Sequence, residues 1–174
     1  QEGKPLYNKL STWQTGGIHQ GYFNGKSNTF NFDNLLTCFD FTSIITNEKV
    51  LGLLTSYLSH MFFSESDGSP RIIFVDEFRR YLESDIFSKI IQRFLEEFRK
   101  LNGIFIAAIQ NINQLYDDPI GRRNIANFGK FIIYPISGNL NREAYEEGIG
   151  LNDSEINWLK TADIFDRKVM IKTK

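Results

Sequence analysis

The sequence is poor in the residues that build disulfides and zinc centres. Among 174 residues there is one cysteine, Cys38, and there are two histidines. A single cysteine excludes an internal disulfide framework and fits a reducing compartment, and these residues are too few for a structural zinc cluster. Any metal bound by this chain must therefore be held by carboxylates.

Long apolar runs and an excess of one charge are also absent. The longest apolar runs, residues 104–109 and 131–134, are far too short to cross a bilayer. With 20 basic and 21 acidic residues the formal net charge is -1, so no global charge points to nucleic acid or to an anionic membrane. By contrast, 41% of the residues are hydrophobic, including 16 Phe and 7 Tyr, which is enough for the core of one globular domain. Because the chain starts at Gln1 without an initiator Met, we expect it to be a fragment or a processed chain.

Apolar strands alternate with amphipathic helices along most of the sequence. Residues 1–34, rich in Gly and Asn, are expected to form loops, with a hairpin as a second option. The pattern then predicts strands at 36–41, 71–75, 104–109, 130–134 and 168–171, and helices at 48–63, at 85–101 and after Asn152. The unbroken apolar character of 71–75 predicts a strand covered on both faces. This order favours an α/β domain with a largely parallel sheet flanked by helices.

Two acids follow the second predicted strand directly, where parallel α/β sheets bind ligands. The apolar run 72–75 and then Asp76-Glu77 form the Walker B pattern of nucleotide triphosphatases. In that pattern the first acid helps to hold Mg²⁺ and the second polarises the attacking water. Two acids at a solvated strand end produce the same pattern by chance, so the neighbouring residues must decide between this alternative and a Walker B site. The pattern predicts Asp76 as a metal ligand and Glu77 as a catalytic residue.

Other polar residues also follow predicted strands. Gln110 ends the next strand, where an amide could sense a γ-phosphate or orient water, although a lone strand-terminal Gln is more often a capping residue. For Asp40 two roles are equally compatible with the sequence. It could bind near the nucleotide, or it could start a turn before Thr42. The stretch ending at Lys26-Ser27 looks like the end of a phosphate-binding loop, but Gln20 stands where that loop needs a glycine. We therefore do not expect Lys26 to bind phosphate.

Taken together, these residues resemble a known family. Residues 72–78, a helix ending at Arg99-Lys100, and a strand ending at Gln110 are similar in order and spacing to the C-terminal ATPase domain of type IV secretion and conjugative-transfer ATPases. This is the VirB fourth-component class within the FtsK and HerA superfamily. Residues 10–13, 38–42, 131–135 and 145–151 fit the same family, so the resemblance spans nearly the whole chain.

The resemblance implies a RecA-like P-loop NTPase core without its N-terminal phosphate-loop portion. Residues 1–174 would then form the C-terminal part of the ATPase domain, with the Walker A loop upstream of residue 1. ATP and Mg²⁺ are the implied cofactors. The implied partners are further copies in a ring, expected to be a hexamer, and other type IV secretion components. The isolated chain is expected to be inactive.

The family also implies a place and a task in the cell. The expected location is cytoplasmic, peripherally on the bacterial inner membrane, and ATP hydrolysis would drive export of a protein or DNA substrate or assembly of the apparatus. Two alternatives stay open: a DNA-translocating motor of the same superfamily, and a non-catalytic α/β interaction module with a decayed nucleotide site.

Arg99 receives its role from the resemblance as well. Related ring ATPases place an arginine at this helix end to reach the nucleotide of the neighbouring subunit, where a guanidinium stabilises charge on the transferring phosphoryl group. The alternative is a solvated arginine that interacts favourably with the helix dipole. Lesser candidates for the same role, or for contacts between subunits, are Arg122, Arg123 and Arg142.

Overall fold

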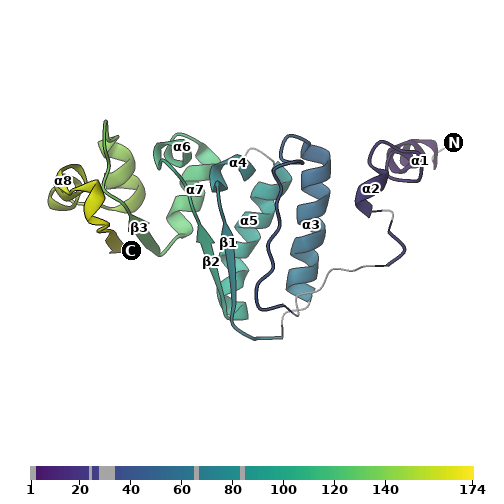
Figure 1. Ribbon diagram of the computed structural model, residues 1–174, viewed down its shortest axis with the longest axis horizontal. Helices are drawn as coiled ribbons and strands as arrows, with labels where there is room; N and C mark the ends of the chain where they lie inside the picture. Colours follow the sequence, from purple (N-terminus) through teal and green to yellow (C-terminus); the bar gives the residue numbers. More distant parts are fainter. Residues whose placement is uncertain (1–2, 24, 28–33, 65–66, 83–84) are drawn as a thin grey trace. The chain divides into compact units, whose positions relative to one another are not determined.

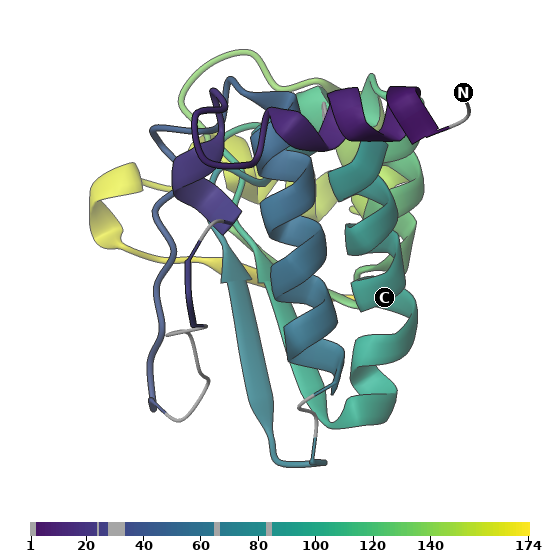
Figure 2. The same ribbon diagram turned by 90° about the vertical axis from the view of Figure 1, so that its right-hand side faces the viewer.

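A computed structural model describes residues 3–23, 25–27, 34–64, 67–82 and 85–174 (Figures 1 and 2). The chain divides into two compact units, Gln1–Glu65 and Ser66–Lys174. The described elements combine helices with short strands, so the predicted mixed α/β class is confirmed.

The first unit contains three helices in its described residues. α1 (Gly3–Ser11) and α2 (Gln20–Phe23) lie where the sequence predicted loops. Aromatic contacts around Trp13 hold this region together, because its ring lies 4.5 Å from that of His19 and 5.6 Å from that of Phe23, centroid to centroid. α3 (Glu48–Ser64) confirms the predicted helix 48–63.

The predicted strand at 36–41 is wrong in the described structure. These residues belong to no strand, and the Leu36 side chain is 85% exposed. A strand requires a neighbouring strand that takes up its backbone hydrogen bonds. None of the described strands pairs with this segment, so its apolar composition alone does not produce one.

In the second unit, two parallel strands form a small sheet. β1 (Arg71–Val75) and β2 (Gly103–Ala107) run side by side in the same direction (Figures 1 and 2), in a register from Arg71↔Gly103 to Val75↔Ala107. The connection between them consists of α4 (Phe78–Tyr81), α5 (Asp85–Glu97) and the 3-10 turn η1 (Phe98–Leu101). This is the helical crossover that parallel strands need.

The two faces of this sheet differ. On one face Phe105 stacks on Phe94 of α5 and meets the edge of Phe78, with ring centroids 6.2 and 6.0 Å apart. On the other face four side chains are between 42% and 65% exposed: Ile72, Phe74, Ile104 and Ile106. Within the second unit α5 and α4 therefore cover one face of β1, and the cover on its other face stays a prediction.

Two residues, Asn102 and Gly103, shape the turn into β2. Gly103 was the expected end of the preceding helix, but the left-handed residue is Asn102, with φ of 60°. Gly103 begins the strand, and the Phe98 ring occupies the space that a Cβ at this position would take. Glycine is needed here because an aromatic ring packs against the backbone.

The rest of the second unit alternates short helices with a second sheet. Its elements are α6 (Asn113–Tyr116), α7 (Pro119–Asn127), β3 (Lys130–Ile133), the π-helix η2 (Ala144–Ile149), α8 (Asp153–Thr161), η3 (Ile164–Asp166) and β4 (Met170–Thr173). β4 pairs antiparallel with β3, from Lys130↔Thr173 to Ile133↔Met170. The expected single, largely parallel sheet is thus wrong for the described strands, which form one parallel and one antiparallel pair.

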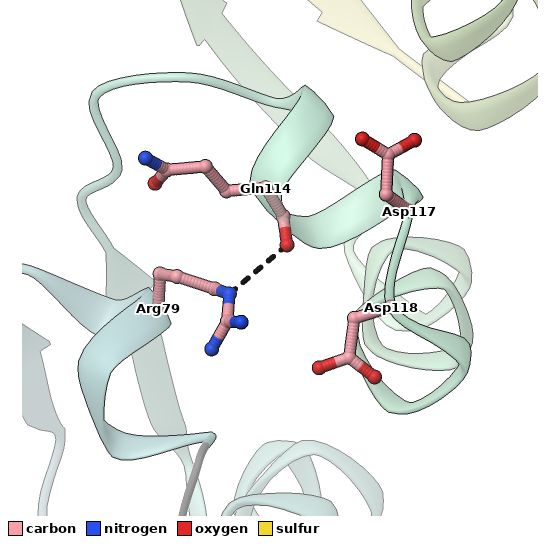
Figure 3. Close-up of a pocket in the computed structure, with 4 residues that line it drawn as sticks. All are labelled: Arg79, Gln114, Asp117 and Asp118. Carbon is pink, nitrogen blue, oxygen red and sulfur yellow. Dashed lines mark hydrogen bonds between the residues drawn. The ribbon is translucent and has the colours of Figure 1, made fainter.

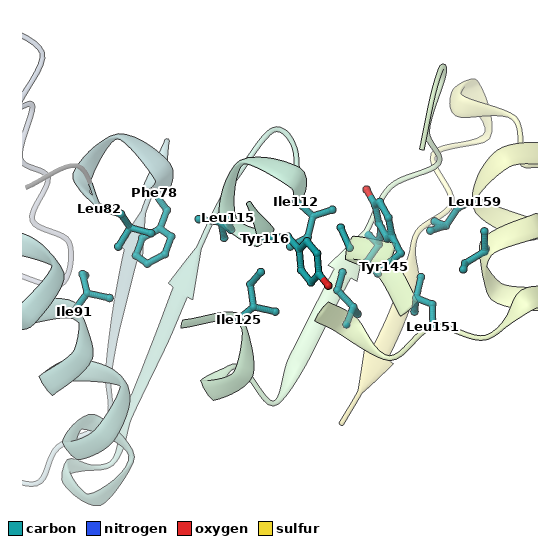
Figure 4. Close-up of a cluster of buried hydrophobic side chains, with 14 of the residues drawn as sticks. Phe78, Leu82, Ile91, Ile112, Leu115, Tyr116, Ile125, Tyr145, Leu151 and Leu159 are labelled. Atoms are coloured by element: carbon teal, nitrogen blue, oxygen red, sulfur yellow. The ribbon is translucent and has the colours of Figure 1, made fainter. Parts of the chain in front are cut away.

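One hydrophobic cluster connects the elements of the second unit (Figure 4). Phe78 of α4 and Ile91 of α5 are buried in it, and so are Ile125 of α7 and Leu159 of α8. Val75, Phe105 and Ala107 of the parallel sheet pack against the same cluster. The core therefore fixes the strand ends of β1 and β2 relative to the helices that follow them.

Candidate functional site

The carboxyl ends of β1 and β2 are joined beyond the last paired residues of the sheet. The Ala108 N–H donates to the Val75 carbonyl at 2.9 Å, and the Phe78 N–H donates to the Ala108 carbonyl at 3.0 Å. These two bonds hold the segments that follow both strands at one edge. The structure thereby brings Glu77 and Gln110 together, as their positions after adjacent strands predicted.

Glu77 has an unusual backbone conformation. Its φ of 49° and ψ of 40° lie in the left-handed region, which is uncommon for a residue with a side chain. The Asp76 Oδ1 atom accepts the Glu77 N–H at 2.9 Å and supports the turn locally. Conformations of this kind persist where the surroundings enforce them, and they occur frequently at functional sites.

The Glu77 side chain reaches across to the neighbouring strand end. The Gln110 Nε2 atom donates a hydrogen bond to Glu77 Oε1, although the two residues are 33 positions apart in the chain. Gln110 is exposed and Glu77 is half-buried, so the pair lies at the surface of the sheet edge. A carboxylate and an amide in contact beside Asp76 form a compact polar site.

Asp76 fits a magnesium ion that keeps most of its own water. Its side chain is exposed, and no group of three or more potential ligands that could hold a metal occurs among the described residues. A single carboxylate does not make a resident metal cage. It does suit Mg²⁺ that arrives with phosphate groups, because this ion binds through one or two carboxylates plus substrate phosphates and water.

Asp40 lies in the first unit, in a local turn. The Thr42 N–H donates to Asp40 Oδ1 at 2.8 Å, and hydrogen bonds from Thr42 lower the pKa of the Asp40 carboxyl. The turn before Thr42 is therefore present, while the place of Asp40 near a nucleotide stays a prediction. Gly25–Ser27 form a bend after α2, and no strand leads into them as a phosphate loop requires.

The predicted arginine at the helix end lies in η1. The side chain of Arg99 is outside the part of the chain that the structure describes, so its role stays a prediction. Two of the lesser candidates have partners in their own chain. Arg122 donates to the Tyr116 carbonyl at 2.9 Å, and its guanidinium lies 4.1 Å from the centre of the Tyr116 ring. Arg142 pairs with Glu146 at 2.6 Å and with Asp153.

A pocket that the sequence analysis missed is built by the segments that follow the two strands. Arg79, Gln114, Asp117 and Asp118 line a cavity of about 360 Å³ (Figure 3). The Arg79 Nε atom donates to the Gln114 carbonyl at 3.0 Å and so ties α4 to α6. The only sequence signal for Arg79 is its position shortly after Asp76-Glu77.

Comparison with known proteins agrees with the resemblance seen in the residues. No protein-family model matches the chain. It is 30% identical over 165 residues to protein VirB4 of Rhizobium radiobacter, covering 94% of this chain and 21% of that protein. It is 28% identical over 165 residues to VirB4 of Agrobacterium fabrum. With the type IV secretion system protein VirB4 of Bartonella henselae it shares 27% identity over 153 residues. The resemblance to the VirB4 class is confirmed.

The chain spans about one fifth of the length of the VirB4 proteins that it matches. The similarity covers both units and therefore includes the site at the ends of β1 and β2. None of the helices that the structure describes is long and apolar enough to span a membrane.

Proposed function

We propose that this chain is the C-terminal part of a RecA-like ATPase domain in a VirB4-type component of a type IV secretion system. The observation that carries the proposal is the contact between Glu77 and Gln110, directly beside Asp76, at the carboxyl ends of two adjacent parallel strands. In a sheet of this kind this edge is where ligands bind. Similarity to VirB4 proteins over 94% of the chain supports the same assignment.

Each residue of the site has a distinct task in ATP hydrolysis. Asp76 would hold Mg²⁺ through water, and the ion would neutralise charge on the phosphates. Glu77 accepts a proton from the attacking water, because a carboxylate within hydrogen-bond reach of that water can act as a general base. Gln110, at the end of the next strand and in contact with Glu77, helps to place the attacking water. A Walker A loop in a segment preceding residue 1 would hold the phosphates.

The wider assembly follows from the same proposal. The domain would work in a ring, expected to be a hexamer, with Arg99 reaching the nucleotide of the neighbouring subunit. It would lie in the cytoplasm, peripherally on the inner membrane, beside other secretion components. Hydrolysis of ATP would drive either export of a protein or DNA substrate or assembly of the apparatus.

The test compares two carboxylate variants of the full-length protein that contains this chain. Glu77→Gln should lower ATP turnover by at least about 100-fold and leave ATP binding intact, because the amide keeps the shape but cannot take a proton. Asp76→Asn should weaken binding that depends on Mg²⁺. Glu96→Gln, on the exposed side of α5, is the matched control and should behave like wild type. Near wild-type turnover by Glu77→Gln would refute the proposal.

A further inference from the structure

The Glu77 carboxylate is fixed by two neighbouring strands rather than by its own segment alone. Its backbone is held by the bond to Asp76 Oδ1 and by the bond of the next N–H, that of Phe78, to Ala108. The direction of a Cα–Cβ bond depends on φ and ψ, so the left-handed conformation of Glu77 is part of what sends its side chain toward β2. There the Gln110 amide meets Oε1.

We propose that Gln110 is a positioning residue, which acts on the attacking water through Glu77 and not by touching phosphate itself. This inference rests on the proposed function and specifies how its site works. Gln110 holds one carboxylate oxygen, Oε1, and leaves Oε2 for the water. Its role is to select one orientation of the Glu77 side chain.

The physical need for such a residue follows from exposure. A Glu side chain at a solvent-exposed edge has several rotatable bonds and loses conformational entropy when it is ordered. A hydrogen bond from a neighbour ordered by the sheet offsets that loss before the nucleotide arrives, and precise placement of a catalytic group strongly affects rate. Gln110 is well placed for this because Ala108, close before it, donates its N–H to Val75 of β1 and accepts the N–H of Phe78 at the start of α4.

An amide suits this position better than a charged group. The Gln110 side chain donates through its NH₂ without carrying charge, so it orients the carboxylate without forming an ion pair with it. A lysine or arginine would pair with the base, and a glutamate would repel it. The neutral amide therefore binds Oε1 of Glu77 and leaves Oε2 able to accept a hydrogen bond from water.

Kinetics of the full-length protein test this role. Gln110→Ala should lower kcat about tenfold while KM for ATP stays unchanged, because the lost contact orders the base and does not bind substrate. Gln110→Glu should lower kcat further, since it replaces the donor by a second carboxylate of the same length. Gln92→Ala, which alters a glutamine on α5 outside the site, is the matched control and should keep the wild-type kcat.

A double-mutant cycle separates action through Glu77 from direct contact with phosphate. In a Glu77→Gln background, Gln110→Ala should cause no further loss of the residual rate and no loss of ATP affinity. If Gln110→Ala weakens ATP binding or lowers the rate equally in both backgrounds, Gln110 touches the nucleotide directly and the inference is overturned.

NMR spectroscopy detects the contact between Gln110 and Glu77 without an activity measurement. The NMR signals of the Gln110 side-chain NH₂ should move on Glu77→Ala and stay in place on Glu96→Ala. Unmoved signals would contradict the contact. An inactive wild-type protein would overturn the proposed function and this inference with it, whereas an active wild type whose kcat is unaffected by Gln110→Ala would overturn the inference alone.

Discussion

At position 77 the backbone adopts a conformation that glycine would take more easily. A residue with a Cβ in this region carries strain of roughly 1–3 kcal/mol. Two hydrogen bonds keep Glu77 in this conformation: its own N–H donates to Asp76 Oδ1, and the N–H of Phe78 donates to the Ala108 carbonyl. The strain is consistent with a residue retained for its carboxylate rather than for stability of the fold.

Replacement of Glu77 by glycine tests this view. Glu77→Gly should leave the free energy of unfolding at least as high as in wild type, with a gain of up to about 1 kcal/mol from relief of strain. The matched control is Glu96→Gly within α5, which should lose about 1 kcal/mol because glycine is a poor helix former. Urea unfolding of the protein measures both. An equal loss for the two variants would show that position 77 is not strained.

Among the elements that the structure describes, α8 begins with a complete capping box. The Asn152 side chain accepts the Glu155 N–H at 3.0 Å, and the Glu155 carboxylate accepts the Asn152 N–H at 2.8 Å, which is a capping box. Lys172 of β4 donates to the same carboxylate at 2.9 Å and lowers the pKa of Glu155. One acid therefore caps α8 and ties it to the antiparallel sheet.

Loss of the cap should have a measurable cost. Asn152→Ala removes the oxygen that accepts the Glu155 N–H and should destabilise the protein by about 1 kcal/mol. Asn157→Ala, at an exposed position of the same helix, is the control and should be neutral or slightly stabilising because alanine favours helix. Thermal unfolding of the two variants decides the matter, and a harmless Asn152→Ala would argue against the capping box.

The link between α6 and η2 predicts a dependence on alkaline pH. The Tyr116 hydroxyl donates to Glu147 at 2.5 Å and lies 3.2 Å from Glu143. The bond to Glu147, then burial, then the charge of Glu143 raise the pKa of Tyr116 to about 12. Since an unfolded tyrosine has a pKa of about 10, the folded state keeps this proton longer than the unfolded state does.

The sign of the effect follows from this difference. The contribution of Tyr116 to stability is complete below about pH 10 and is lost as the pH rises from about 10 to about 12. Wild type should therefore lose more stability over this interval than Tyr116→Phe, as measured by denaturant unfolding at a series of pH values. Burial also raises the pKa of Tyr145, so the difference between the two proteins is the relevant quantity. Parallel curves would exclude the effect.

Local signals predicted the elements whose causes lie within a short stretch of sequence. The apolar runs of β1 and β2, the stripe of α5 and the cap at Asn152 all correspond to observed elements. Pairing between strands that are distant in the sequence could not be predicted from local patterns. The segment 36–41 needed a partner strand that the described residues do not supply, and β4 pairs antiparallel because of where the chain returns after α8.

The site was predictable to the extent that it follows strand ends. Asp76, Glu77 and Gln110 could be proposed because parallel strands bring their carboxyl ends to one edge. The left-handed backbone of Glu77 and the position of Arg79 at a pocket could not, because both depend on contacts with the segment after β2.

At the scale of the whole molecule, the proposed ring requires that subunits complete one another's active sites. In the full-length protein, Arg99→Ala should lower turnover by roughly 10³-fold if Arg99 stabilises phosphoryl charge in a neighbour. Mixing Arg99→Ala with Glu77→Gln subunits should restore some activity, because an intact site then meets an intact arginine. Full activity of Arg99→Ala alone would leave Arg99 as a solvated helix-end residue, and no recovery despite co-assembly would place its action within its own subunit.

In the proposed ATPase site, the ends of β1 and β2 face the phosphate that is hydrolysed. The most direct measurement is the position of the nucleotide in a crystal or cryo-EM structure of the full-length protein with Mg²⁺ and a non-hydrolysable ATP analogue. We expect the γ-phosphate at this edge, with Asp76 toward the Mg²⁺ water shell and Glu77 within hydrogen-bond reach of the attacking water. A nucleotide bound elsewhere, with Glu77 and Gln110 remote from its phosphates, would contradict it.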